Sequence, residues 1–165
     1  MNDSQLGRPQ LSKIHSELDQ IVQESESLIA EFQRITQKTP QEPYSLFGFL
    51  RKKRNADAYD NFCSVDNKLG DAVEHFARFR ADNAHYLSVP TRAYVAAYEE
   101  YLQSVKTAAE LRVAFEQQFM ELNMSTSSAE QVDDMKKLSG MIGPSLEDCE
   151  EKAHWVNHVI NSFKR

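Results

Sequence analysis

The residues best spaced for joint chemistry form the segment Glu151-Lys152-Ala153-His154, a single Glu-x-x-His motif followed one helical turn later by His158. Di-iron four-helix bundles use two such motifs and two further glutamates, because two metal ions need four carboxylates and two imidazoles. On a helix that turns about 100° per residue, His154 and His158 also point away from the apolar stripe of their segment. We therefore expect no metal centre and no cofactor. A ferritin-like bundle that binds metal through Glu151, His154 and His158 is the alternative.

The patterns that accompany other enzyme chemistries are absent from the sequence. It contains no Gly-x-Ser-x-Gly turn and no phosphate-binding glycine loop. Cys63 and Cys149 fall on or beside apolar stripes, where unreactive buried thiols are found. No histidine has the lysine and glycine that typically follow the phosphorylated histidine of a phosphotransfer domain. The sequence therefore favours a protein that is not an enzyme, with no catalytic residue to assign.

An apolar and aromatic run that leads straight into four positive charges occupies residues 45–54. Its members that could contact a partner or a membrane are Leu46, Phe47, Phe49, Arg51, Lys52, Lys53 and Arg54. Such a segment could insert its apolar side chains at a membrane interface while the basic ones contact anionic headgroups. A capped turn that covers the end of the fold, or a site for a protein partner, fits the same residues. We expect one of these latter two.

Elements that would position these residues are delimited by clusters of glycine and proline. The segments between the clusters have apolar residues at helical spacing, and we predict helices over residues 10–37, 56–82, 91–123, 128–139 and 145–164, the last two being pieces of one broken helix. Short connections between long helices favour antiparallel neighbours. The predicted fold is an all-α up-and-down bundle of about four main helices. Residues 9–165 form its single domain, and residues 1–8 are loosely ordered.

The predicted helices differ in the width of their apolar faces. In helix one the apolar residues follow a strict 3-4 spacing from Leu11 to Ile35, which is typical of a coiled-coil seam and suggests a homodimer through this helix. Helix three has a broader apolar face, as expected for the central helix. Its tyrosine row, Tyr94, Tyr98 and Tyr101, could either line an interface or fill the end of the bundle.

Composition and charge narrow the classes of partner. The chain has 165 residues and a formal net charge of −6, which disfavours binding to nucleic acid or to an anionic membrane. No apolar run reaches the eighteen residues of a membrane span, and no signal peptide is visible, so we expect a cytoplasmic protein. The sequence predicts a non-enzymatic module for protein–protein interaction or regulation, whose partner it does not identify.

Overall fold

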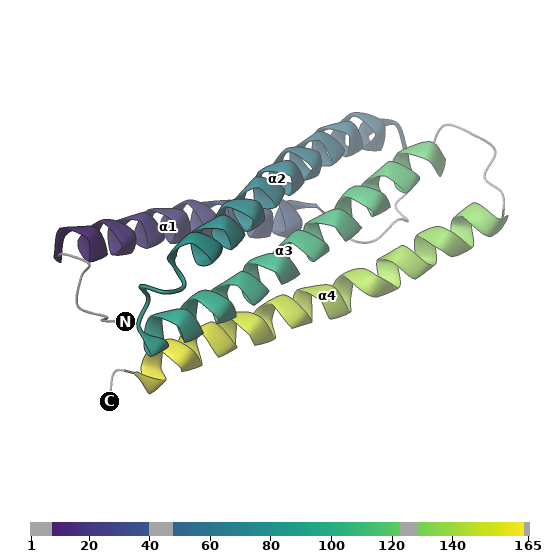
Figure 1. Cartoon of the computed structure of the whole chain (residues 1–165). Helices are drawn as coiled ribbons and strands as arrows, with labels where there is room; N and C mark the ends of the chain where they lie inside the picture. The colour runs from purple at the N-terminus through teal and green to yellow at the C-terminus, as the bar shows by residue number, and fades with distance from the viewer. Residues whose placement is uncertain (1–7, 40–47, 123–128, 164–165) are drawn as a thin grey trace.

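Four long helices make up the described parts of the chain. The computed structural model describes residues 8–39, 48–122 and 129–163, and the side chains of residues 10–39, 57–121 and 129–163. The helices are α1 (Arg8–Lys38), α2 (Gly48–Asn83), α3 (Val89–Leu122) and α4 (Ala129–Ser162). Consecutive helices run in opposite directions (Figure 1). The predicted all-α up-and-down bundle is confirmed.

Local hydrogen bonds explain where several helices end. The Ser88 hydroxyl accepts a hydrogen bond from the backbone N–H of Thr91 at 3.3 Å, and so caps the first turn of α3. At the end of α2, the side-chain amide of Asn83 donates to the Phe79 carbonyl at 3.0 Å. At the end of α1, the Thr39 hydroxyl donates to the Ile35 carbonyl at 2.9 Å. The Ser88 contact satisfies a backbone N–H that the helix leaves open, whereas the Thr39 hydroxyl shares the Ile35 carbonyl with the backbone N–H of Thr39.

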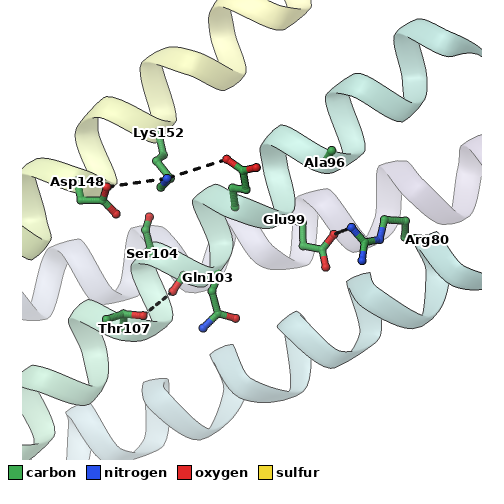
Figure 2. A pocket seen from close by; sticks show the side chains of 9 residues that line it. Arg80, Ala96, Glu99, Gln103, Ser104, Thr107, Asp148 and Lys152 are labelled. Carbon is green, nitrogen blue, oxygen red and sulfur yellow. Dashed lines mark hydrogen bonds and ion pairs between the residues drawn. The ribbon is translucent and has the colours of Figure 1, made fainter.

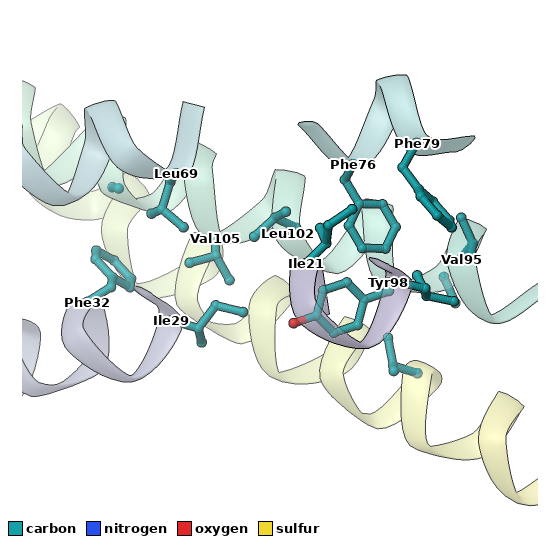
Figure 3. Close-up of a cluster of buried hydrophobic side chains, with 14 of the residues drawn as sticks. Ile21, Ile29, Phe32, Leu69, Phe76, Phe79, Val95, Tyr98, Leu102 and Val105 are labelled. Carbon is teal, nitrogen blue, oxygen red and sulfur yellow. The ribbon is translucent and has the colours of Figure 1, made fainter. Parts of the chain in front are cut away.

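The main hydrophobic core lies where α1, α2 and α3 meet (Figure 3), and two α4 valines complete it. Phe62, Val65, Leu69 and Phe76 of α2 and Leu102 of α3 are fully buried in it. A second, smaller cluster lies between α3 and α4 and contains Phe115, Phe119, Met135 and Ile142. The core therefore follows α3 along its length.

The apolar seam of α1 faces the inside of the bundle. Ile14, Leu18, Ile21 and Phe32 are buried in the main core. Ser25, which interrupts the seam, is also completely buried, and its hydroxyl donates to the Ile21 carbonyl at 2.8 Å. The residues that suggested pairing with a second copy thus pack against α2 and α3 of the same chain.

The predicted break in the last helix is wrong, because α4 is one continuous helix through Gly140, Gly143 and Pro144. Proline lacks the N–H that would bond to the Gly140 carbonyl, which is why the sequence suggested an end there. Apolar side chains continue at 3-4 spacing on both sides of it, including Ile142 and Leu146, and both pack along α3. Packing of these apolar side chains against α3 outweighs the hydrogen bond that Pro144 cannot form.

The predicted start of helix two near Ala56 is also wrong, since the helical backbone of α2 begins at Gly48. The basic block Arg51-Lys52-Lys53-Arg54 therefore lies in the first turns of α2. Lysine and arginine are good helix formers, and no glycine or proline interrupts the chain between Gly48 and Gly70. The expectation for residues 1–8 falls almost entirely outside the described residues.

α3 is the central helix, as its broad apolar face predicted. It packs closely against α2 and α4, and α1 lies mainly on α2 with a smaller contact to α3. Within the described ranges, no Cα atom of α1 lies within 8 Å of a Cα atom of α4. The bundle is therefore open between its first and last helices.

Candidate functional site

The Glu-x-x-His motif lies on the outward face of α4. Glu151, His154 and His158 are all exposed, and the His158 ring stacks on Trp155 with 5.3 Å between ring centroids. Across the described part of the chain, no three His, Cys, Asp or Glu side chains are placed to hold one metal ion together. Within the described ranges, Glu151, His154 and His158 therefore do not form such a group.

The basic segment can be located only in part. Leu46 and Phe47 lie outside the described residues. Phe49 and residues 51–54 belong to the helical backbone of α2, and their side chains lie outside the described set. No helix among the described residues is long and apolar enough to cross a membrane.

Neither cysteine has the surroundings of a nucleophile. Cys63 and Cys149 are both free thiols and half-buried. Burial is the main cause that raises the pKa of the Cys149 thiol above its usual value. A raised pKa keeps the neutral thiol, whereas nucleophilic attack needs the thiolate.

Two hollows lie on opposite sides of α3, and the first is polar. This polar hollow has a volume of about 460 Å³ and is lined by Arg80, Ala96, Glu99, Glu100, Gln103, Ser104, Thr107, Asp148 and Lys152. Figure 2 shows Arg80 reaching Glu99 and Lys152 facing Asp148. The Arg80 guanidinium lies 2.8 Å from the Glu99 carboxylate, and Lys152 lies 4.0 Å from Glu100 and 3.9 Å from Asp148. Ion pairs that join helices thus occupy its charged groups.

The hydroxyl groups of the polar hollow are not poised for catalysis. Ser104 donates its hydroxyl proton to the Tyr101 carbonyl at 2.7 Å, and Thr107 donates to the Gln103 carbonyl at 3.0 Å. A serine or threonine nucleophile instead needs its proton directed at a general base. No histidine lines this hollow. The polar hollow is therefore a surface whose charged side chains form ion pairs with one another.

The second hollow is an apolar groove between α1 and α4, with α3 as its floor. Its volume is about 310 Å³. The lining residues are Ile29, Phe32, Gln33, Thr36 and Gln37 of α1, Tyr101 and Val105 of α3, and Leu146, Cys149, Glu150 and Ala153 of α4. Ile29, Phe32 and Val105 lie together in Figure 3. The groove exists because α1 and α4 both contact α3 without approaching each other.

One polar atom in the apolar groove lacks a partner. The Thr36 hydroxyl oxygen is buried and forms no hydrogen bond. Threonine in a helix commonly donates to the carbonyl four residues earlier, as Thr107 does in α3. Thr36 does not, and a buried polar atom without a partner costs about 1–3 kcal/mol. Because the oxygen is not accessible from the groove, this cost belongs to the packing of the α1 wall.

The tyrosine row lies beside the same groove. Tyr98 is buried, stacks on Phe76 with 5.2 Å between centroids, and donates its hydroxyl to the Val22 carbonyl at 3.3 Å. Burial raises the pKa of Tyr94 to about 12, and also raises the pKa of Tyr98 and Tyr101. The nearby carboxylate of Glu26 contributes to all three shifts. The row therefore belongs to the core, and Tyr101 also lines the groove.

A buried ion pair lies further along α3. The guanidinium of Arg112 is completely buried and donates to the Glu116 carboxylate at 3.1 Å. Its Nε and Nη1 atoms have no hydrogen-bond partner, while its charged centre lies 4.8 Å from the centroid of the Phe62 ring. Burial lowers the pKa of Arg112 and raises the pKa of Glu116. Both side chains are buried and belong to the core of the bundle.

The sequence did not single out the apolar groove, because its walls have the composition of a core. Tyr101, Leu146, Cys149 and Ala153 all follow the apolar stripes of their helices. The one feature of the sequence that points to the groove is Ile29, which follows Leu28 and makes the apolar face of α1 broader on the side toward α4.

Comparison with protein-family models, with curated proteins and with solved structures finds no match to this chain.

Proposed function

We propose that this protein is a non-enzymatic interaction module that binds a partner protein in the apolar groove between α1 and α4. The observation that carries this proposal is the open side of the bundle. There, apolar side chains of three helices form a groove that no fourth described helix covers. Grooves of this kind bind amphipathic helices, whose apolar face replaces the missing neighbour.

The groove replaces helix one as the proposed docking surface. Self-association through helix one rested on its apolar seam, and that seam is buried against α2 and α3. The groove, in contrast, lies at the surface, where a partner can reach its apolar lining. The polar hollow is a weaker candidate, since its charged groups already pair with one another.

The test fills the groove with a larger side chain. Ala153 is half-buried in the α4 wall, and the Ala153→Phe substitution would place a ring where the partner binds. Ala96→Phe is the matched control, because Ala96 is exposed on the opposite side of α3 in the polar hollow. Affinity capture from the native host with quantitative mass spectrometry compares the three proteins.

We expect partners that are recovered with the unmodified chain and with Ala96→Phe to be lost with Ala153→Phe. Circular dichroism and urea unfolding show that both variants are folded. If Ala153→Phe retains every partner that the unmodified chain recovers, then the groove is not the docking site.

A further inference from the structure

We propose that the partner segment is an amphipathic helix whose apolar stripe is flanked by lysine or arginine. This inference rests on the proposed docking function of the groove, and adds to it the chemistry of the molecule that binds there. Two features carry it, namely the length of the groove and the carboxylates in and near its lining.

The length of the groove fits two to three turns of helix. Its α1 wall runs from Ile29 to Gln37 and its α4 wall from Leu146 to Ala153. At 1.5 Å per residue these walls are about 12 Å long. A helix of this length presents three apolar side chains at positions i, i+4 and i+7 on one face. The partner therefore needs only a short apolar stripe.

The one charged residue that lines the groove is negative. Glu150 lines it directly, and Glu26 lies close enough to Tyr94, Tyr98 and Tyr101 to raise the pKa of each phenol. Among the described residues neither carboxylate takes part in an ion pair, and no lysine or arginine lines the groove. In the polar hollow on the other side of α3, by contrast, each of the three carboxylates has a basic partner.

Unpaired carboxylates, Glu150 in the lining and Glu26 near the tyrosine row, favour positive charge on whatever enters the groove. Charge complementarity of this kind determines which partner is selected and how fast it associates. An acidic helix would place like charges next to Glu26 and Glu150, which opposes binding. The overall charge of −6 acts in the same direction at longer range.

The experiment uses two synthetic peptides of eighteen residues with the same leucine stripe at i, i+4 and i+7. One peptide has lysine and the other glutamate at the flanking positions. Fluorescence anisotropy measures the binding of each to the full chain at low and at high salt. We expect the lysine peptide to bind about threefold to tenfold more tightly at low salt, with the preference reduced at high salt.

Variants of the chain assign the binding to the groove and to its carboxylates. Ala153→Phe should abolish binding of the lysine peptide, and Ala96→Phe should leave it unchanged. Glu26→Gln with Glu150→Gln should remove most of the preference for lysine over glutamate. Asp71→Asn with Asp82→Asn is the matched control, since it changes the net charge equally at two exposed residues of α2.

The other possible outcomes distinguish a failure of this inference from a failure of the proposed function. If both peptides bind equally and Ala153→Phe abolishes both, the groove is a docking site but the basic partner is wrong. If the lysine peptide binds equally to Ala153→Phe, it binds the acidic surface and the inference is overturned. Failure of both peptides to bind also overturns it, as does a dimer in sedimentation equilibrium that Ala153→Phe dissociates.

Discussion

At the scale of single residues, the least expected feature is the buried charge of Arg112. Removing an ion pair from water costs several kcal/mol per ion, and the attraction between the two charges repays this only when their other hydrogen bonds are satisfied. Arg112 leaves two nitrogen atoms without acceptors. The contact with the Phe62 ring offsets part of that cost, by about 0.5–2 kcal/mol.

Removing one partner of this pair should be more harmful than removing both. Glu116→Ala leaves a buried guanidinium without a counter-charge, and we expect it to lower the free energy of unfolding by about 3–5 kcal/mol. Arg112→Met combined with Glu116→Leu removes both charges and fills the same space, so its stability should equal or exceed that of the unmodified chain. Urea unfolding at neutral pH measures all three proteins. A double variant as unstable as Glu116→Ala would contradict this reasoning.

Residue spacing predicted which way the motif histidines of α4 face, but not which charged side chains are buried. The outward direction of His154 and His158 followed from helical spacing alone, and both side chains are exposed. The Arg112–Glu116 pair was not predicted, because an arginine and a glutamate four residues apart on a helix usually form an exposed pair. Only the packing of α2 against α3, which places Phe62 over Arg112, shows that the pair is buried.

At the scale of elements, α4 shows where local sequence rules fail. The rule that glycine and proline end helices predicted a break at residues 140–144. The rule was outweighed by apolar residues that keep one register on both sides of Pro144 and pack along α3. Such a result depends on a neighbour that is distant in the sequence, and a local rule contains no information about it.

The continuity of α4 predicts the effect of Gly140→Ala. No described glycine has a positive φ, and a Cβ atom at Gly140 would meet nothing within 4 Å. Alanine in a helix interior is more stable than glycine by about 0.5–1 kcal/mol, so the free energy of unfolding should rise by this amount. A helix broken at this position would instead end on a left-handed glycine, and alanine would then be destabilising.

Gly143→Ala is the contrasting variant in the same helix. Its Cβ atom would also meet nothing within 4 Å apart from the adjacent residues, but Gly143 directly precedes Pro144. In a helical backbone the proline ring crowds the Cβ atom of the residue before it, so urea unfolding should show no comparable gain for Gly143→Ala. A loss of stability in Gly140→Ala would show that α4 is not a regular helix at that residue.

At the scale of the whole molecule, the up-and-down order of the helices was predictable, whereas the open side was not. Helix lengths and short connections determine the order, and both can be read from the spacing of apolar residues and helix breakers. The groove depends on how far apart α1 and α4 lie across α3. Leu146 and Ala153 would be apolar and at helical spacing whether or not another helix covered them. The sequence pattern therefore does not distinguish a covered face from an open groove.

The stability of the whole fold depends on whether the phenols of the tyrosine row are protonated. Burial raises the pKa of Tyr94 to about 12 and also raises those of Tyr98 and Tyr101, while an unfolded tyrosine ionises near pH 10. Between pH 10 and 12 the unfolded chain therefore loses protons that the folded chain keeps. Stability that is fully present below pH 10 is lost as the pH rises through this range.

The prediction is that the chain unfolds more easily at pH 11 than at pH 8, and that Tyr94→Phe reduces the difference. A phenol with a pKa raised by two units would account for about 1.4 kcal/mol of the loss at pH 11, and solvent screening of the half-buried Tyr94 reduces this upper bound. Phenylalanine cannot ionise. Urea unfolding at the two pH values gives the difference for each protein. Absorbance at 295 nm should show tyrosinate forming at higher pH in the folded chain than in urea. Coincident titration curves would mean that water reaches the phenols, and that the tyrosine row does not lie in a closed core.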